Sequence, residues 1–168
     1  MPPPLILDPA SLDLKNVIAD REAIRRANPH RGQMEHLTAV VYMDTENHVI
    51  AGYKDVRPDE FWTDGHFPNY PLLPGVIQCE AAAQLLGFYA VVNDVCPGNL
   101  LGLGGLDDVR FRGPVKPGDR LVIVGKGIRV HRRQTLFNAQ GFVNNELVFE
   151  CQVMGLPIAR IETLKPTG

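Results

Sequence analysis

Two side chains near the middle of the chain have the types and the spacing needed for acid–base chemistry. His66 lies on a segment that three prolines stiffen, and Glu80 follows it fourteen residues later in an apolar run. An imidazole titrates near neutral pH, and burial raises the pKa of a carboxyl group that has no partner. The pair therefore indicates a functional site in which Glu80 is a buried catalytic acid. The alternative is structural: a lone histidine on a loop, and a carboxylate satisfied by a buried partner.

The carboxylate belongs to a long predicted helix. No proline interrupts residues 76–92, alanine and leucine dominate there, and Pro74 suits the first position of a helix. The helix is roughly 25 Å long at 1.5 Å per residue, and it is apolar on nearly every side, so we expect it to be buried. Glu80 and Gln84 are four residues apart and share one face, and Gly87 continues the same stripe.

The remaining segments predict a sheet. Residues 36–43 and 47–56 carry β-branched and aromatic residues around a turn and are predicted to form a hairpin, and four more strand candidates cover 101–112, 120–130, 134–143 and 146–155. Asn144 and Asn145 form a tight-turn signal between the last two. A short helix over 21–27 is predicted after its cap, Asp20. One long buried helix against an antiparallel sheet of about six strands gives the α+β class.

The chain length and composition indicate one globular domain. We expect an N-terminal arm at residues 1–19 and a single domain at residues 20–168. The net charge of −2 gives no reason to expect nucleic acid or an acidic membrane as a partner. The three cysteines have no paired spacing, which favours a reducing compartment. The sequence shows no basic leader and no uninterrupted apolar run of membrane-spanning length. We therefore expect a cytoplasmic protein with no membrane span.

The central motif resembles the 3-hydroxyacyl-[acyl-carrier-protein] dehydratases of the FabZ/FabA type. The resemblance covers about residues 20–160. It is carried by Gly65-His66-Phe67-Pro68, Pro71, Leu73-Pro74-Gly75-Val76, Glu80-Ala81, Gln84, the block at 106–119 and Pro29-His30-Arg31.

That resemblance implies a fold, a reaction and partners. The fold is the hotdog fold, a long central helix wrapped by a curved antiparallel sheet. The reaction is dehydration of 3-hydroxyacyl thioesters, held on acyl carrier protein, to trans-2-enoyl thioesters in fatty acid biosynthesis. The assembly is a homodimer, or a trimer of dimers, with the histidine and the acid of each site on different subunits. No metal or organic cofactor is expected, because the thioester of the substrate acidifies the proton that is removed.

Within this reaction each predicted residue has a role. His66 is the base, and Glu80 is the acid that protonates the departing hydroxyl. The N–H of Gly75 at the helix start is unused by the helix and could stabilise the oxyanion, with Val76 beside it. Gln84 and Gly87 are assigned to substrate binding, with Gln84 orienting Glu80 or lining the interface. A route in which His66 alone moves the proton while Glu80 holds a water stays open.

Some features leave other functions open. Gly32-Gln33 stand after Pro29-His30-Arg31, where the dehydratases usually have Tyr-Pro, so the tyrosine that resembles a gate in that family is missing at this position. We expect His30 to be structural. The alternatives are a hotdog acyl thioesterase and a non-catalytic acyl-binding paralogue. The basic run at 129–133 could meet an acidic carrier protein, or it is the solvated end of a strand.

Overall fold

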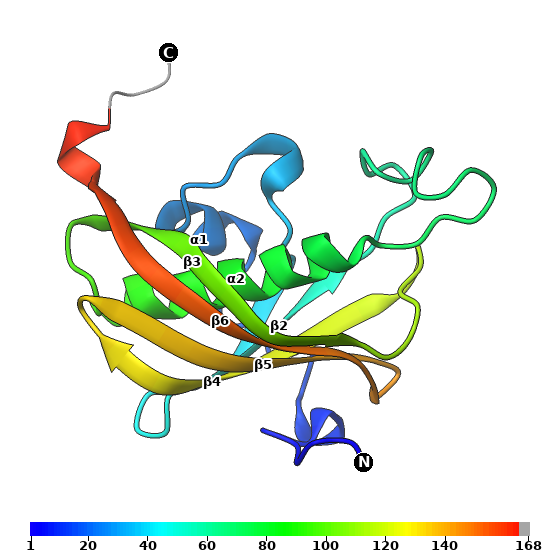
Figure 1. Ribbon diagram of the computed structural model, residues 1–168, viewed down its shortest axis with the longest axis horizontal. Coiled ribbons are helices and arrows are strands. Elements are labelled where there is room, and N and C mark those ends of the chain that lie inside the picture. The colour runs from blue at the N-terminus through cyan, green and yellow to red at the C-terminus, as the bar shows by residue number, and fades with distance from the viewer. Residues whose placement is uncertain (165–168) are drawn as a thin grey trace.

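The computed structural model describes residues 1–164, and it confirms the α+β hotdog prediction. The long helix α2 (Gly75–Val92) lies across one face of a curved six-stranded sheet (Figure 1). Every neighbouring pair of strands is antiparallel, and the spatial order is β1-β2-β4-β5-β6-β3. The strands are β1 (Ala39–Asp44), β2 (Val49–Asp55), β3 (Asn99–Phe111), β4 (Arg120–His131), β5 (Gln134–Val143) and β6 (Glu146–Arg160).

Five strands differ from their predicted bounds, and the two largest differences, at the start of β1 and the end of β6, have identifiable reasons. The first strand begins at Ala39 rather than at residue 36, because the His36 N–H donates to the Gln84 side chain instead of to a strand. The last strand continues five residues past the predicted end at 155. A proline normally ends a strand, but Pro157 pairs with Leu101 next to a register shift, where a missing N–H is tolerated. The turn at Asn144 and Asn145 is confirmed, since both have the positive φ that such hairpins need.

Helix α2 forms the centre of the main core. Leu85, Ala81 and Ala82 have no exposed surface, and they pack in one cluster with Leu121 and Ile123 of β4. The helix is long and apolar enough to span a membrane by length and composition, and more than half of its residues are buried in this fold. Burial inside the domain therefore accounts for its hydrophobicity. Its only partly exposed positions between residues 78 and 90 are Glu80, Ala83 and Gly87.

Shorter elements cover the two faces of the sheet. Helix α1 (Arg21–Ala27) contacts α2, and its predicted cap is confirmed by a bond of 2.8 Å from the Ala23 N–H to Asp20. The short 3₁₀ turns are η1 (Pro9–Ser11), η2 (Gly32–Met34) and η3 (Ile161–Thr163). Residues 1–14 lie against the other face, where apolar side chains such as Ile6 and Leu7 pack on a second cluster. The division into an arm at 1–19 and a domain at 20–168 stays a prediction, and residues 165–168 lie outside the described part.

Candidate active site

Glu80 does not lie alone in the core. Its Oε1 is 3.3 Å from Nε2 of His30, and it accepts a hydrogen bond of 2.9 Å from the Gln84 amide. The side chains of Glu80 and His30 are 23% and 31% exposed, so both reach the edge of a cavity. His30 was predicted to be structural, and the structure instead places it beside the candidate acid. The Pro29-His30-Arg31 motif was the available sequence signal for this contact.

This environment changes the charge expected on Glu80. Burial raises its pKa, but hydrogen bonds from His30 and Gln84, together with the charge of His30, outweigh burial and hold the pKa below its usual value. The predicted raised pKa is therefore wrong for the single chain, where Glu80 is a carboxylate at neutral pH. An ionised Glu80 can hold and orient a hydroxyl group or a water, but it has no proton to give.

Gln84 fixes the carboxylate to the segment that carries His30. Its Nε2 donates to Glu80 and, at 2.7 Å, to the backbone carbonyl of Met34, while its Oε1 accepts from the His36 N–H at 3.0 Å. The side chain is buried, and three partners determine its orientation. Gln84 thus makes the contacts required of a residue that orients Glu80.

His66 is held with one ring nitrogen available. Its Nδ1 lies 2.8 Å from the carbonyl of Leu72, which only accepts, so Nδ1 carries the proton and Nε2 of the neutral ring has the free lone pair. The Leu72 N–H in turn donates to the His66 carbonyl at 2.7 Å, which closes the loop between them. The loop therefore presents Nε2 as the basic atom.

The predicted site residues fall into two separate groups within one chain. His66, Gly75 and Val76 line a pocket of about 410 Å³ together with Phe111 of β3. Glu80 and Gly87 line a different cavity of about 280 Å³, and Gln84 contacts Glu80. One chain alone does not bring the base and the acid to the same pocket.

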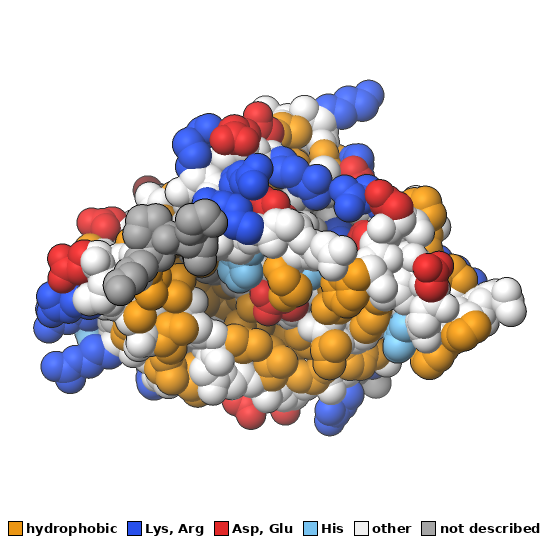
Figure 2. Space-filling model, turned by 90° about the horizontal axis from the view of Figure 1, so that it is seen from above, with side chains coloured by type: hydrophobic (Ala, Val, Ile, Leu, Met, Phe, Trp, Pro, Cys, Tyr) orange, Lys and Arg blue, Asp and Glu red, His pale blue; other side chains and the backbone are white. Residues whose placement is uncertain are grey.

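The Glu80 cavity has a polar end and an apolar end. Glu80, His30 and Arg31 lie at one end, and the lining continues along α2 and the start of β3 to η3. Figure 2 shows a hollow lined by hydrophobic side chains, with histidine and acidic groups at its margin and Lys and Arg side chains gathered beside it. A ligand with a polar reactive group and an apolar tail fits this polarity.

Gly75 occupies a position that has no room for a side chain. A Cβ at this residue would lie 2.5 Å from the ring of Phe111. Close approach of the ring therefore explains the glycine, and Gly75 at the start of α2, where backbone N–H groups have no partner within the helix, lines the His66 pocket.

Comparison with known proteins gives the family. Residues 28–152 match the FabA-like domain. A 3-hydroxyacyl-[acyl-carrier-protein] dehydratase FabZ of Halorhodospira halophila is 36% identical over 137 residues, which cover 80% of this chain and 89% of the relative. The chain belongs to the FabZ/FabA-type dehydratase family.

Solved structures agree on the fold. A chain of the dehydratase heterocomplex ApeI:P of Xenorhabdus doucetiae superposes with a TM-score of 0.70 at 18% identity, covering 81% of this chain and 91% of that one. A thioesterase-titled protein of Streptococcus pneumoniae, solved with coenzyme A, gives a TM-score of 0.54 at 11% identity over 81% and 91% of the two chains. At these identities the likeness establishes the hotdog fold alone.

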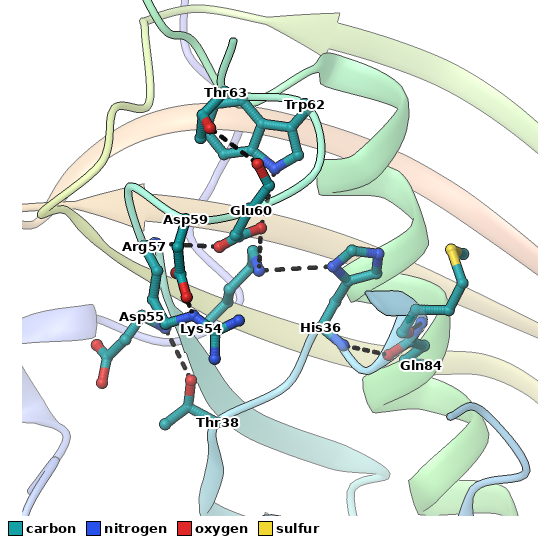
Figure 3. Close-up of polar contacts among 11 residues, drawn as sticks. His36, Thr38, Lys54, Asp55, Arg57, Asp59, Glu60, Trp62, Thr63 and Gln84 are labelled. Atoms are coloured by element: carbon teal, nitrogen blue, oxygen red, sulfur yellow. Dashed lines mark hydrogen bonds and ion pairs between the residues drawn. The ribbon is translucent and has the colours of Figure 1, made fainter. Parts of the chain in front are cut away.

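A buried ion pair supports both halves of the site in this dehydratase-family chain (Figure 3). Lys54 Nζ lies 3.0 Å from Glu60 Oε2 and 3.5 Å from His36 Nδ1. Glu60 also accepts from the Trp62 indole at 2.9 Å, and the Trp62 carbonyl accepts from the His66 N–H. The cluster thus ties the loop that carries His66 to the segment that contacts Gln84.

This ion pair could not be predicted from the sequence. Lys54 and Glu60 have side chains only 5% and 7% exposed, whereas lysine and glutamate at a strand end and in a loop are normally solvated. Nothing in residue spacing distinguishes them from surface charges.

Protein stability is expected to depend on the pH through His36. Burial, and secondly the charge of Lys54, lower the pKa of His36 from 6.5 to about 4. The unfolded chain therefore binds the proton more readily between pH 6.5 and 4, and the free energy of unfolding should fall by about 3 kcal/mol as the pH drops through that window. Urea unfolding at a series of pH values measures this loss.

The matched variant for this test is His36→Gln, which keeps a neutral polar side chain. It should remove most of the slope between pH 6.5 and 4, while the loss of stability at lower pH, where Glu60 is protonated, should remain. An unchanged slope in the variant would contradict the assignment to His36.

Proposed function

We propose that this chain dehydrates 3-hydroxyacyl thioesters to trans-2-enoyl thioesters in fatty acid biosynthesis. The observation that carries the proposal is His66: in a chain of this family, its loop presents Nε2 as the free basic atom next to the start of α2. Glu80 in its polar setting and the apolar cavity that follows it supply the second group and the room for an acyl chain.

The roles follow from the charges of the groups. His66 Nε2 takes a proton from the carbon next to the thioester carbonyl, and the Gly75 N–H stabilises the charge that develops on the thioester oxygen. The C3–O bond breaks, and the departing hydroxyl takes the proton from the imidazolium, so that water leaves and His66 returns to its neutral form. Of the two open routes, the lowered pKa of Glu80 favours this one, with Glu80 holding the hydroxyl.

Two copies of the chain complete the site. Strand β3 is a sheet edge, and Leu103, Leu106 and Phe111 on it are exposed. If two β3 strands pair antiparallel about a two-fold axis, the Phe111 end of one lies beside the Leu101 end of the other. Phe111 lines the His66 pocket and Leu101 lines the Glu80 cavity, so this pairing brings the base of one copy towards the acid of its partner.

The assembly is therefore a homodimer, and a trimer of dimers is its expected larger form. Light scattering of the purified protein at assay concentrations measures the assembly, and a fully active monomer would contradict the shared site.

The carrier protein is expected to dock beside helix α1. Arg25 and Arg26 on α1 are exposed, and Arg26 and Arg31 line the Glu80 cavity, whereas the basic run at 129–133 lies on the β4–β5 hairpin. An acidic acyl carrier protein that delivers a thioester to this cavity would meet the α1 arginines first.

Arg26→Glu is expected to raise KM for a carrier-bound substrate about tenfold at low salt, with a smaller effect at high salt. KM for the same acyl group on coenzyme A should change little, because that substrate lacks the acidic protein. The matched control is Arg132→Glu on the hairpin. A larger effect from the control than from Arg26→Glu would move the docking surface to the hairpin.

We expect the reaction to take place in the cytoplasm. Cys79, Cys96 and Cys151 are all free and buried, which suits a reducing compartment. Fractionation of cells that produce the full chain tests this location.

The direct test of function follows the absorbance of the enoyl thioester with carrier-bound and coenzyme A-bound 3-hydroxyacyl substrates. Enoyl formation is the expected result, faster with the carrier-bound form. Release of free thiol without enoyl product would instead show a thioesterase, and no reaction with either substrate would show an acyl-binding paralogue.

A further inference from the structure

We propose that Gly87 sets how far an acyl chain can extend beyond the reacting carbons, and so determines the chain length that the enzyme accepts. The inference rests on the proposed function, since it identifies the Glu80 cavity as the place of the acyl chain.

The cavity follows one face of α2. Glu80, Ala83, Gly87 and Val91 line it, three or four residues apart, which places them in one row along the helix. Opposite this row are side chains of the sheet and of the segment 161–164, among them Leu101, Leu103, Phe137, Val153, Ile161 and Leu164. Beyond its polar end, the cavity is therefore an apolar channel that runs from Glu80 towards the C-terminal end of α2.

The helix leaves open space in this channel at Gly87. A Cβ built at this residue meets no heavy atom within 4 Å, whereas at Gly52, Gly125 and Gly141 a Cβ would collide with neighbouring atoms. Packing thus explains those three strand glycines but not Gly87. Glycine inside a helix makes the helix less stable than alanine would. The glycine at this position therefore needs another explanation, and a ligand that occupies the open space beside it supplies one.

The position of Gly87 gives an approximate length. It lies seven residues after Glu80, which is roughly 10 Å along the helix at 1.5 Å per residue. An extended chain advances roughly 1.2 Å per bond, so an acyl group passes Gly87 about eight bonds beyond the carbon that Glu80 faces. Short acyl groups should end before this point, and long ones must pass it.

The test compares Gly87→Ala and Gly87→Leu with the parent on substrates of four, six, twelve and sixteen carbons. For Gly87→Leu, we expect kcat/KM on the sixteen-carbon substrate to fall at least about tenfold. This is the usual loss when a pocket has no room for one methylene group of the substrate. Activity on the four-carbon substrate should stay within about threefold. Gly87→Ala should shift the preference less, and its Tm should rise by about 2–4 °C through helix propensity.

The matched control is Val92→Leu, which enlarges an exposed residue of the same helix that does not line the cavity. It should leave the chain-length profile unchanged. An unchanged profile in Gly87→Leu, with normal dehydration by the parent, would overturn the inference and leave the proposed function intact.

Binding separates the inference from the proposed function. If the parent dehydrates no substrate, the proposed function fails, and the cavity is tested with a dansyl-labelled long-chain fatty acid by fluorescence. Saturable binding by the parent that weakens at least about tenfold in Gly87→Leu, but not in Val92→Leu, supports the role of Gly87. Equal binding by the parent and Gly87→Leu, or no binding by the parent, overturns it.

Discussion

Replacing His66 by alanine is expected to lower kcat for dehydration by about 10²–10⁴-fold, the usual contribution of a general base. The reason is that the Nε2 lone pair is the basic atom that the loop presents, and alanine has no group to replace it. The melting temperature should change little. The Leu72 N–H still donates to the backbone carbonyl of residue 66, and the side chain contributes only one bond to the loop.

His131→Ala is the matched control, because it removes an exposed histidine on the β4–β5 hairpin, outside both pockets of the proposed site. Its rate should equal that of the parent. A rate within threefold of the parent for His66→Ala would rule out His66 as the base.

Replacing Glu80 by glutamine should also reduce kcat, by about 10²–10³-fold as for a lost electrostatic contact to the reacting groups, while stability stays nearly constant. The amide is close to the carboxylate in size, but it lacks the negative charge. That charge orders the departing hydroxyl and pairs with His30. Since both side chains of that pair are partly exposed, losing it should cost no more than about 1 kcal/mol. A melting curve and a dehydration rate on the same preparation measure the two effects.

Glu46→Gln provides the control for this substitution, as it makes the same change at an exposed glutamate in the β1–β2 turn, outside both pockets. Suppose that Glu80→Gln instead lost about 3–5 kcal/mol of stability while each folded molecule kept its normal turnover. Glu80 would then be a structural carboxylate and not a catalytic group.

The local elements of this fold follow from the sequence because their causes are local. The proline-free apolar run gives α2, the Asp20 side chain caps α1, and positive φ at Asn144 and Asn145 closes the last hairpin. The start of β1 did not follow, because a side chain forty-eight residues away, Gln84, takes the N–H of His36.

The site could be predicted only in part, for the same reason. His66 and Glu80 have characteristic residue types at a characteristic spacing, but the charge on Glu80 depends on His30, fifty residues before it. Burial alone predicts a neutral acid there, and only the folded chain shows the partner. The pair of Lys54 and Glu60 is likewise set by tertiary packing.

Mixing two inactive variants tests the central claim, that His66 and Glu80 act together across two copies of the chain. His66→Ala and Glu80→Gln chains carry different affinity tags, are produced together, and the hybrid dimer is purified through both tags. In a shared site, the hybrid keeps one site with an intact His66 from one chain and an intact Glu80 from the other. The account predicts that the hybrid recovers about half of the parent rate per dimer. A hybrid as inactive as the two single variants would contradict it, because each site would then draw both groups from one chain.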